Sequence, residues 1–300
     1  MFFRTVFALF CGFVFFGKTV SAQPAVIVSV APLHSAVSAV MQGVGTPELL
    51  LNPAVSVHDY HLKPSDMQRL AKADILFWGG PALESFLQKP LVSAGLSDKN
   101  VAFLADPRLK TYPFRSASTA DVDGHFWLDP ENMAQAARIA AEKLAISDPA
   151  HAVLYSENAD RFEQQMRELK ENGQSKLQAY LDRPYVTFHD AYQYFEKSFH
   201  LTPIGFVFVD PHHAGSAGHI AGLREKIRQA GKVCLFAEPQ FSDKRIKIVA
   251  EDLPVIFGTL DPSGVNLKPG VGFYAELMNN LFESFAGCFS RLAEQETGGR

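Results

Sequence analysis

The sequence has little cysteine, no excess of basic residues and, beyond its N-terminus, no long apolar run. Its three cysteines among 300 residues form no Cys-x-x-Cys pair, which argues against a cysteine-based zinc site. The 28 Lys and Arg are outnumbered by 32 Asp and Glu, for a net charge of −4. Because phosphate binding needs clustered basic residues, this mild acidity argues against a nucleic acid partner. No stretch after the N-terminus is long enough for a membrane-spanning helix.

The N-terminal segment has the pattern of a cleavable secretory signal. Residues 1–22 combine Arg4 with an apolar run at 6–16 that is too short to span a bilayer, and they end in small residues. We predict a signal peptide over 1–22 with cleavage near Ala22–Gln23; a retained membrane anchor is the alternative. Cys11 lies within the apolar run and would leave with the signal.

Two cysteines remain after this cleavage, Cys234 and Cys288. An even number in an exported chain is typical of a disulfide in an oxidising compartment. We therefore predict one disulfide between them, with two unrelated buried thiols as the alternative.

Short β-rich runs alternate with helical patterns along the rest of the chain. Such alternation favours two α/β lobes with mainly parallel sheets. The runs predicted as strands are 25–30, 48–51, 75–78, 101–104, 185–188, 204–209, 233–237 and 255–257. Helices are predicted at 34–41, from Pro64 and from Glu131, where proline or capping residues open them.

One stretch differs from both flanks because it is rich in Ala, Glu, Gln, Lys, Arg and Leu. Between 150 and 181 apolar residues recur at helical spacing, with Gly173 as the weak point. We interpret it as one long rigid helix that joins the lobes; an ordinary helix of a single core is the alternative. The predicted division is an N-terminal lobe at 23–149, a linking helix at 150–182 and a C-terminal lobe at 183–300.

Three of the ten histidines stand out through their surroundings. His58 and His125 lie in loops just before predicted helices, and His189 ends a β-rich run. Ligands of open α/β sheets bind beyond the carboxyl ends of strands, and imidazole is a favoured zinc ligand. The three residues lie far apart in the sequence, so only tertiary structure could assemble them. By themselves they are a weak signal, since each is as readily structural or surface-exposed.

Five motifs in order strengthen this interpretation: VHDYHLKPSD, GHFWLDPENM, FHDAYQYF, LFAEPQF and FGTLDPSGVNL. Together, over about residues 27–288, they closely resemble the periplasmic zinc-binding proteins of zinc ABC importers, the ZnuA-like branch of the cluster A-I binding proteins. The resemblance implies two α/β lobes joined by one long, stiff helix, with Zn²⁺ in the interlobe cleft. It places the zinc ligands at His58, His125 and His189, and the paired cysteines of the zinc branch at Cys234 and Cys288.

The function that this resemblance implies is capture of Zn²⁺ in the periplasm and its delivery to the membrane permease of an ABC importer. We expect a monomer with no catalytic step and no small organic substrate. Manganese-binding relatives carry a carboxylate where this chain has His189, and three imidazoles favour zinc over manganese. A manganese carrier and a zinc-dependent hydrolase remain the alternative functions.

The fourth ligand is left open between water and Asp261, which matches an aspartate ligand of the manganese relatives but equally begins a turn with Pro262. Some zinc members carry an acidic residue before the first histidine, where this chain has Val57. Many also insert a His- and Asp-rich loop ahead of the second histidine, whereas here the corresponding stretch, residues 112–124, is short and contains no histidine. We expect Glu238 to support the site or to cap backbone groups rather than to bind zinc, and His61, His212 and His213 to be surface residues or auxiliary ligands.

Overall fold

The protein is described here by a computed structural model that covers residues 23–93, 95–115, 122–210, 213–214 and 216–297. The predicted signal peptide, its cleavage site and His212 lie outside these residues. Within them, no helix is both long enough and apolar enough to cross a membrane.

The N-terminal sheet has four parallel strands in the order β2-β1-β3-β4. Its strands are β1 (Val26–Val28), β2 (Glu48–Leu49), β3 (Ile75–Trp78) and β4 (Asn100–Ala102). Its helices are α1 (Ala31–Val40), α2 (Pro64–Leu70) and α3 (Ser85–Ser93), with 3₁₀ turns η1 (Val57–Asp59) and η2 (Phe103–Ala105). All residues of β1 and β3 are buried, as expected for parallel strands covered on both faces.

The C-terminal sheet has five strands in the order β7-β6-β5-β8-β9, and all neighbours are parallel except β6 and β7. Its strands are β5 (Tyr185–His189), β6 (Gly205–Asp210), β7 (His213–Ala214), β8 (Val233–Ala237) and β9 (Val255–Thr259). Its helices are α6 (Gln193–Phe199), α7 (Ala217–Ala230) and α8 (Asp243–Ala250). The two predicted lobes with mainly parallel sheets are confirmed.

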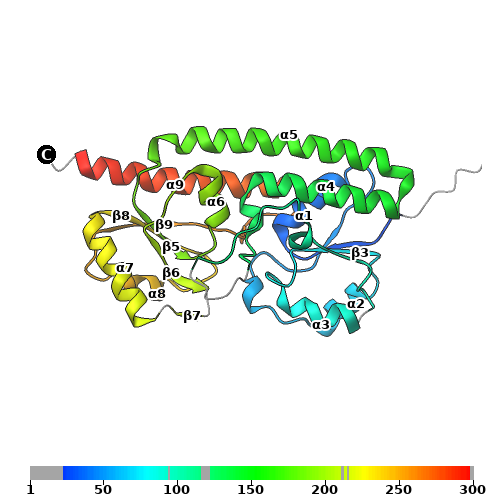
Figure 1. Cartoon of the computed structure of the whole chain (residues 1–300), viewed down its shortest axis with the longest axis horizontal. Coiled ribbons are helices and arrows are strands. Elements are labelled where there is room, and N and C mark those ends of the chain that lie inside the picture. The colour runs from blue at the N-terminus through cyan, green and yellow to red at the C-terminus, as the bar shows by residue number, and fades with distance from the viewer. Residues whose placement is uncertain (1–22, 94, 116–121, 211–212, 215, 298–300) are drawn as a thin grey trace, which may run out of the picture.

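Long helices run along one side of both sheets (Figure 1). They are α4 (Pro130–Ser147), α5 (Ala152–Leu177) and α9 (Phe273–Thr297), with 3₁₀ turns η3 (Phe126–Leu128), η4 (Pro149–His151) and η5 (Gln178–Tyr180). Helix α5 extends over both lobes, packing on α1 and α4 in the N-terminal lobe and on α6 in the C-terminal lobe, with α9 beside it. The predicted long helix joining the lobes is thus confirmed.

Helix α9 lies beside α5 and also contacts α1, so a second helix connects the lobes. This helix was not among the elements predicted from the sequence. Gly173 makes the close approach of the two helices possible, because a Cβ there would lie 2.3 Å from Phe282 of α9 and 2.7 Å from Phe199. One apolar cluster contains side chains of α1, α4, α5, β5 and α9. A continuous core, rather than a flexible linker, therefore joins the two sheets.

The predicted disulfide is present between Cys234 of β8 and Cys288 of α9. Both cysteines are fully buried. The bond ties the middle of the C-terminal sheet to the second connecting helix.

Candidate metal site

His189 lies at the carboxyl end of β5, where the order of the C-terminal sheet reverses. From β5 the chain passes to β6 on one side and later returns to β8 on the other. Glu238 directly follows β8, and its Oε1 lies 2.7 Å from His189 Nδ1. Both side chains are buried. Burial disfavours the charged ring, but the carboxylates of Glu238, Asp123 and Asp190, with Glu238 foremost, together outweigh it and raise the pKa of His189 above its ordinary value.

The contact with Glu238 orients the imidazole. With its proton on Nδ1, the His189 ring donates to Glu238, and the lone pair of Nε2 is left available toward the other two histidines. His189 Nε2 is buried and has no hydrogen-bond partner within the described part of the chain. A buried polar nitrogen without a partner is costly, so this atom is suited to receive a ligand.

His125 comes from the other lobe and is held in a similar way. It precedes the 3₁₀ turn η3, and its Nδ1 lies 2.8 Å from Asp123 Oδ1, which also accepts the His125 backbone N–H at 3.0 Å. Asp123 is fully buried and His125 nearly so. A carboxylate on Nδ1 leaves Nε2 as the ligand atom, the arrangement common to histidines that bind zinc.

His58 lies on the 3₁₀ turn η1 in the loop after β2 and is only half-buried. Its backbone N–H donates to the Ser56 hydroxyl at 3.3 Å, which caps the turn. The third histidine is thus presented by a loop, whereas the other two are fixed by buried carboxylates.

The structure brings these three histidines together. One ring nitrogen of each lies within 4.8 Å of the others. The ring centroids are 5.5 Å apart for His58 and His125, 6.1 Å for His58 and His189, and 5.3 Å for His125 and His189. The cavity between them has about 20 Å³ of space that water could fill, little more than one water molecule needs. It therefore has room for an ion.

Asp261 lies near this cavity but has other contacts. Its Oδ1 accepts the backbone N–H groups of Ser263 at 3.0 Å and Gly264 at 2.8 Å and the amide of Gln240 at 3.0 Å. Its Oδ2 accepts the N–H of Val265 at 2.7 Å. Among the described residues, the group that could hold a metal comprises the three histidines without Asp261. These contacts favour its turn-forming role.

Other histidines of the described chain lie outside this site. His61 is exposed, and His213 belongs to the edge strand β7. Within the fold, His34 pairs with the Pro47 carbonyl at 3.0 Å and His219 with that of Phe206 at 2.9 Å. His151 contacts the buried Asp148, with 2.7 Å between Nδ1 and Oδ2.

Two further residues shape the site: sequence reasoning missed Asp123, and it indicated only that Trp127 packs around the loops. Asp123 fixes the His125 ring, and its only sequence signal was its position two residues before that histidine. Trp127 is buried 5.2 Å from the His125 ring, centroid to centroid, and its indole N–H donates to the Pro262 carbonyl at 2.9 Å. This bond joins the turn after His125 to the loop of the opposite lobe.

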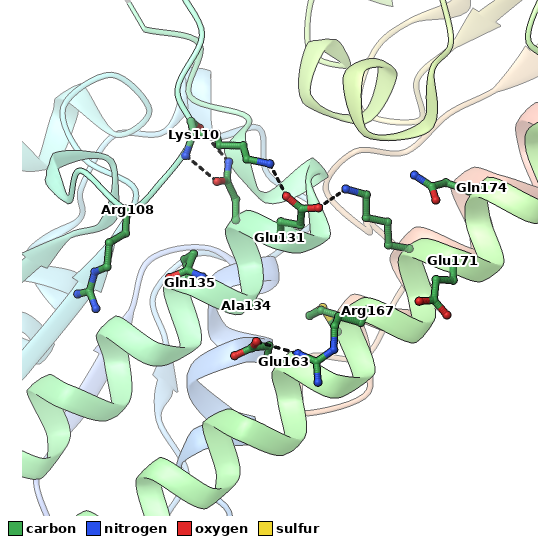
Figure 2. Close-up of a pocket in the computed structure, with 12 residues that line it drawn as sticks. Arg108, Lys110, Glu131, Ala134, Gln135, Glu163, Arg167, Glu171 and Gln174 are labelled. Atoms are coloured by element: carbon green, nitrogen blue, oxygen red, sulfur yellow. Dashed lines mark hydrogen bonds and ion pairs between the residues drawn. The ribbon is translucent and has the colours of Figure 1, made fainter.

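A large groove lies away from the histidines, between α4 and α5 (Figure 2). It has about 560 Å³ and is lined by charged side chains. Lys110 and Lys170 both pair with Glu131, and Arg167 pairs with Glu163 at 2.7 Å. The groove shares no lining residue with the histidine cavity.

Comparison with known proteins gives a consistent result. Residues 26–288 match the model of the ZnuA family, described as zinc-uptake complex component A, periplasmic. The chain is 35% identical to the "High-affinity zinc uptake system protein ZnuA" of Brucella suis, over 94% of this chain and 95% of that one. It is 32% identical to the protein of the same name from Yersinia pestis, over 89% and 92%.

Among solved structures, the fold is similar to that of the periplasmic zinc-binding protein TroA from Treponema pallidum. The TM-score is 0.79 at 21% identity, covering 89% of this chain and 99% of that one. At this identity the similarity concerns the fold alone.

Proposed function

Since the chain belongs to the ZnuA family of periplasmic zinc-uptake components, we propose that it captures Zn²⁺ in the periplasm and delivers it to the membrane permease of an ABC-type zinc importer. The observation that carries this proposal is the convergence of ring nitrogens from His58, His125 and His189 within 4.8 Å. A tetrahedral zinc ion with bonds of about 2.0–2.1 Å holds its nitrogens about 3.4 Å apart. Binding would thus require only a small contraction of the site.

The donor set favours zinc over manganese. Three neutral imidazoles suit zinc, whereas manganese prefers carboxylate and carbonyl oxygens. Asp123 and Glu238 each occupy the Nδ1 of a histidine, so they act behind the ligands rather than as ligands. The alternative of a manganese carrier therefore has weaker support.

We propose that water completes the coordination, because both carboxylate oxygens of Asp261 already accept hydrogen bonds. A bound water leaves the ion exchangeable, which suits a carrier that must release it. If Asp261 is instead a ligand, its removal will reduce zinc affinity greatly.

We propose no catalytic step. A zinc hydrolase also uses three protein ligands and an open position, but it needs space for its substrate beside the metal. The cavity of about 20 Å³ gives no such space in this conformation. The groove between α4 and α5 lies apart from the histidines.

The remaining parts of the proposal concern processing and partners. We propose that residues 1–22 are removed near Ala22–Gln23, and that the mature chain acts as a monomer. In it, lobes 23–149 and 183–300 flank the zinc. Its partner is the permease, with no nucleic acid or small organic ligand.

The test is metal titration of the mature chain starting at Gln23. We expect one tight Zn²⁺ per chain and much weaker Mn²⁺ binding. His58→Ala, His125→Ala and His189→Ala should each weaken zinc binding by more than the roughly 10- to 100-fold typical of residues that support ligands. A variant that keeps wild-type affinity would remove that histidine from the ligand set.

Asp261→Ala distinguishes the two options for the fourth position. With water as the ligand, we expect zinc affinity to change by only a few-fold and thermal stability to fall, because the turn loses its hydrogen bonds. A loss as large as that of the histidine variants would make Asp261 the ligand. Activity against a broad set of hydrolase substrates would contradict the absence of catalysis.

A further inference from the structure

The segment that leads to His125 is bound to the opposite lobe. Residues 112–115 and 122–124 follow the N-terminal sheet but lie against α6, which follows β5. The Tyr112 and Tyr194 rings are 4.9 Å apart, and the Tyr112 N–H donates to the Tyr194 hydroxyl at 3.1 Å. Gln193 of α6 donates to the Pro113 carbonyl at 3.0 Å. These contacts join the lobes beside the histidines.

Arg115 makes the charged part of this junction. Its Nε lies 2.8 Å from Asp190 Oδ1, its Nη2 contacts the same oxygen, and its Nη1 lies 2.6 Å from Glu196 Oε2. Asp190 is fully buried and Glu196 is 4% exposed, whereas the Arg115 side chain keeps 28% of its surface. One guanidinium thus bridges two buried carboxylates of the C-terminal lobe.

This cluster of one guanidinium and two carboxylates is sensitive to the loss of the Arg115 side chain. Removing one partner of a buried ion pair leaves an uncompensated charge and is strongly unfavourable. Here two carboxylates would remain, with Asp190 Oδ2 and Glu196 Oε1 already lacking partners among the described residues. The end of β5 and α6 would therefore rearrange or take up water when Arg115 is absent.

Both buried histidines depend on this junction. Asp190 directly follows His189, so the guanidinium holds the backbone next to that ring. On the other side, the Tyr194 hydroxyl donates to the Asp123 carbonyl at 2.9 Å, and Asp123 orients His125. The contacts of α6 with residues 112–115 and with Asp123 therefore link one histidine from each lobe.

We propose that Arg115 is a positioning residue for zinc binding, which sets the relative placement of His125 and His189 by pairing with Asp190 and Glu196. This inference rests on the proposed zinc-binding function and assigns a task to the short segment before His125. The described residues of this segment, 112–115 and 122–123, connect the two lobes. Arg115 itself does not contact the ion.

The experiment is a chelator-competition titration of Zn²⁺ with Arg115→Ala, Arg115→Lys and the control Arg108→Ala. Arg108 also pairs with two carboxylates, those of Asp106 and Glu142, but wholly within the N-terminal lobe. We expect zinc affinity to fall roughly 10- to 100-fold in Arg115→Ala, as for other residues that support ligands. Zinc affinity should fall less in Arg115→Lys, because lysine keeps the positive charge. It should still fall, because the ammonium group lacks the planar set of N–H donors with which the guanidinium reaches both carboxylates. Arg108→Ala should stay within about twofold of wild type.

A double-mutant cycle with His125→Ala separates positioning from general stability. If Arg115 acts by aligning His125 with His189, Arg115→Ala will lower zinc affinity much less in the His125→Ala background. Equal losses in both backgrounds, or wild-type affinity in Arg115→Ala, would overturn the inference. Should Arg115→Ala fail to fold, Arg115→Lys carries the same cycle. If the wild-type chain binds no zinc, the proposed function fails, and that result differs from a wild-type chain that binds zinc independently of Arg115.

Discussion

The four parallel strands of the C-terminal sheet follow the same order as those of the N-terminal sheet, but the two lobes use this order differently. In the N-terminal sheet β1 lies between β2 and β3, with β4 beyond; in the C-terminal sheet β5 lies between β6 and β8, with β9 beyond. A buried carboxylate lies at the equivalent place in each, beside the carboxyl ends of the two central strands. Glu84 occupies it in the N-terminal lobe and Glu238 in the C-terminal lobe.

The two carboxylates have different partners. Glu84 accepts the Ser29 hydroxyl at 2.5 Å and the backbone N–H groups of Gly79 at 3.2 Å and Gly80 at 3.0 Å. Glu238 instead holds an imidazole. At the carboxyl ends of the central strands, the N-terminal lobe thus has a hydrogen-bond network among its own groups. At the same place the C-terminal lobe has a carboxylate that orients a candidate zinc ligand. The fold supplies the position, and the residues after each strand decide its chemistry.

The largest expected effect is the loss of stability on reduction of the disulfide. Among the described residues, this bond involves the C-terminal sheet and not the N-terminal sheet. Cys234 and Cys288 close a loop across 54 positions, worth about 4 kcal/mol by the chain-entropy model. We expect the reduced chain to lose about this much free energy of unfolding in denaturant titrations. Zinc stoichiometry should not change, because neither sulfur belongs to the site. Two free thiols in unreduced periplasmic protein would contradict the disulfide.

The next largest expected effect is the pH dependence of stability that Glu84 causes in the N-terminal lobe. Burial raises its pKa to about 7, against the lowering effect of its hydrogen bonds to Ser29, Gly79 and Gly80. The folded state then holds this proton up to a higher pH than the unfolded state does. Stability from this group is present below its unfolded pKa of about 4.5 and is lost as the pH rises through 7. The change amounts to at most about 3 kcal/mol, at 1.36 kcal/mol per pKa unit.

The measurement is the free energy of unfolding of the zinc-free protein from pH 4.5 to 8, compared with Glu84→Gln. The variant should lack the part of the pH slope due to Glu84, whatever its baseline stability. Identical slopes in the two proteins would mean that Glu84 titrates as an ordinary carboxyl group.

The smallest expected effect is on zinc affinity, when Glu238, the buried carboxylate of the C-terminal lobe, is substituted. Glu238→Gln keeps an oxygen near His189 Nδ1 but removes the charge that increases the basicity of the ring. We expect zinc affinity to fall roughly 10- to 100-fold, or about 1.4–2.7 kcal/mol. Asp148→Asn is the matched control, since Asp148 is also buried and lies 2.7 Å from a histidine Nδ1, that of His151. It should change stability without changing zinc affinity, and equal losses in both variants would remove the special role of Glu238.

Much of the fold could be predicted from local patterns. The strands Ile75–Trp78 and Val233–Ala237 match their predicted bounds, because each is a continuous apolar run between polar flanks. Other elements differ at their ends: the run at 101–104 is a strand only to Ala102, and Phe103 begins a 3₁₀ turn. Helix α9 was missed as a connecting element. Its place beside α5 depends on the contact of Phe282 with Gly173, which lies far away in the sequence.

The sequence by itself determined the alternation of strands and helices, the long apolar-faced helix and, through its motifs, the family and the three candidate histidines. These features depend on neighbouring residues or on motifs that can be read directly from the chain. Only the tertiary structure decided how supporting side chains pair with the histidines and with each other; of these side chains, the sequence had pointed to Glu238 alone. Asp123, Glu238 and Arg115 act across distances of 2.6–2.8 Å that arise where the two lobes and separate strand ends meet. Pairing of buried charges is set by packing in three dimensions, since a carboxylate without a partner is stable only in water.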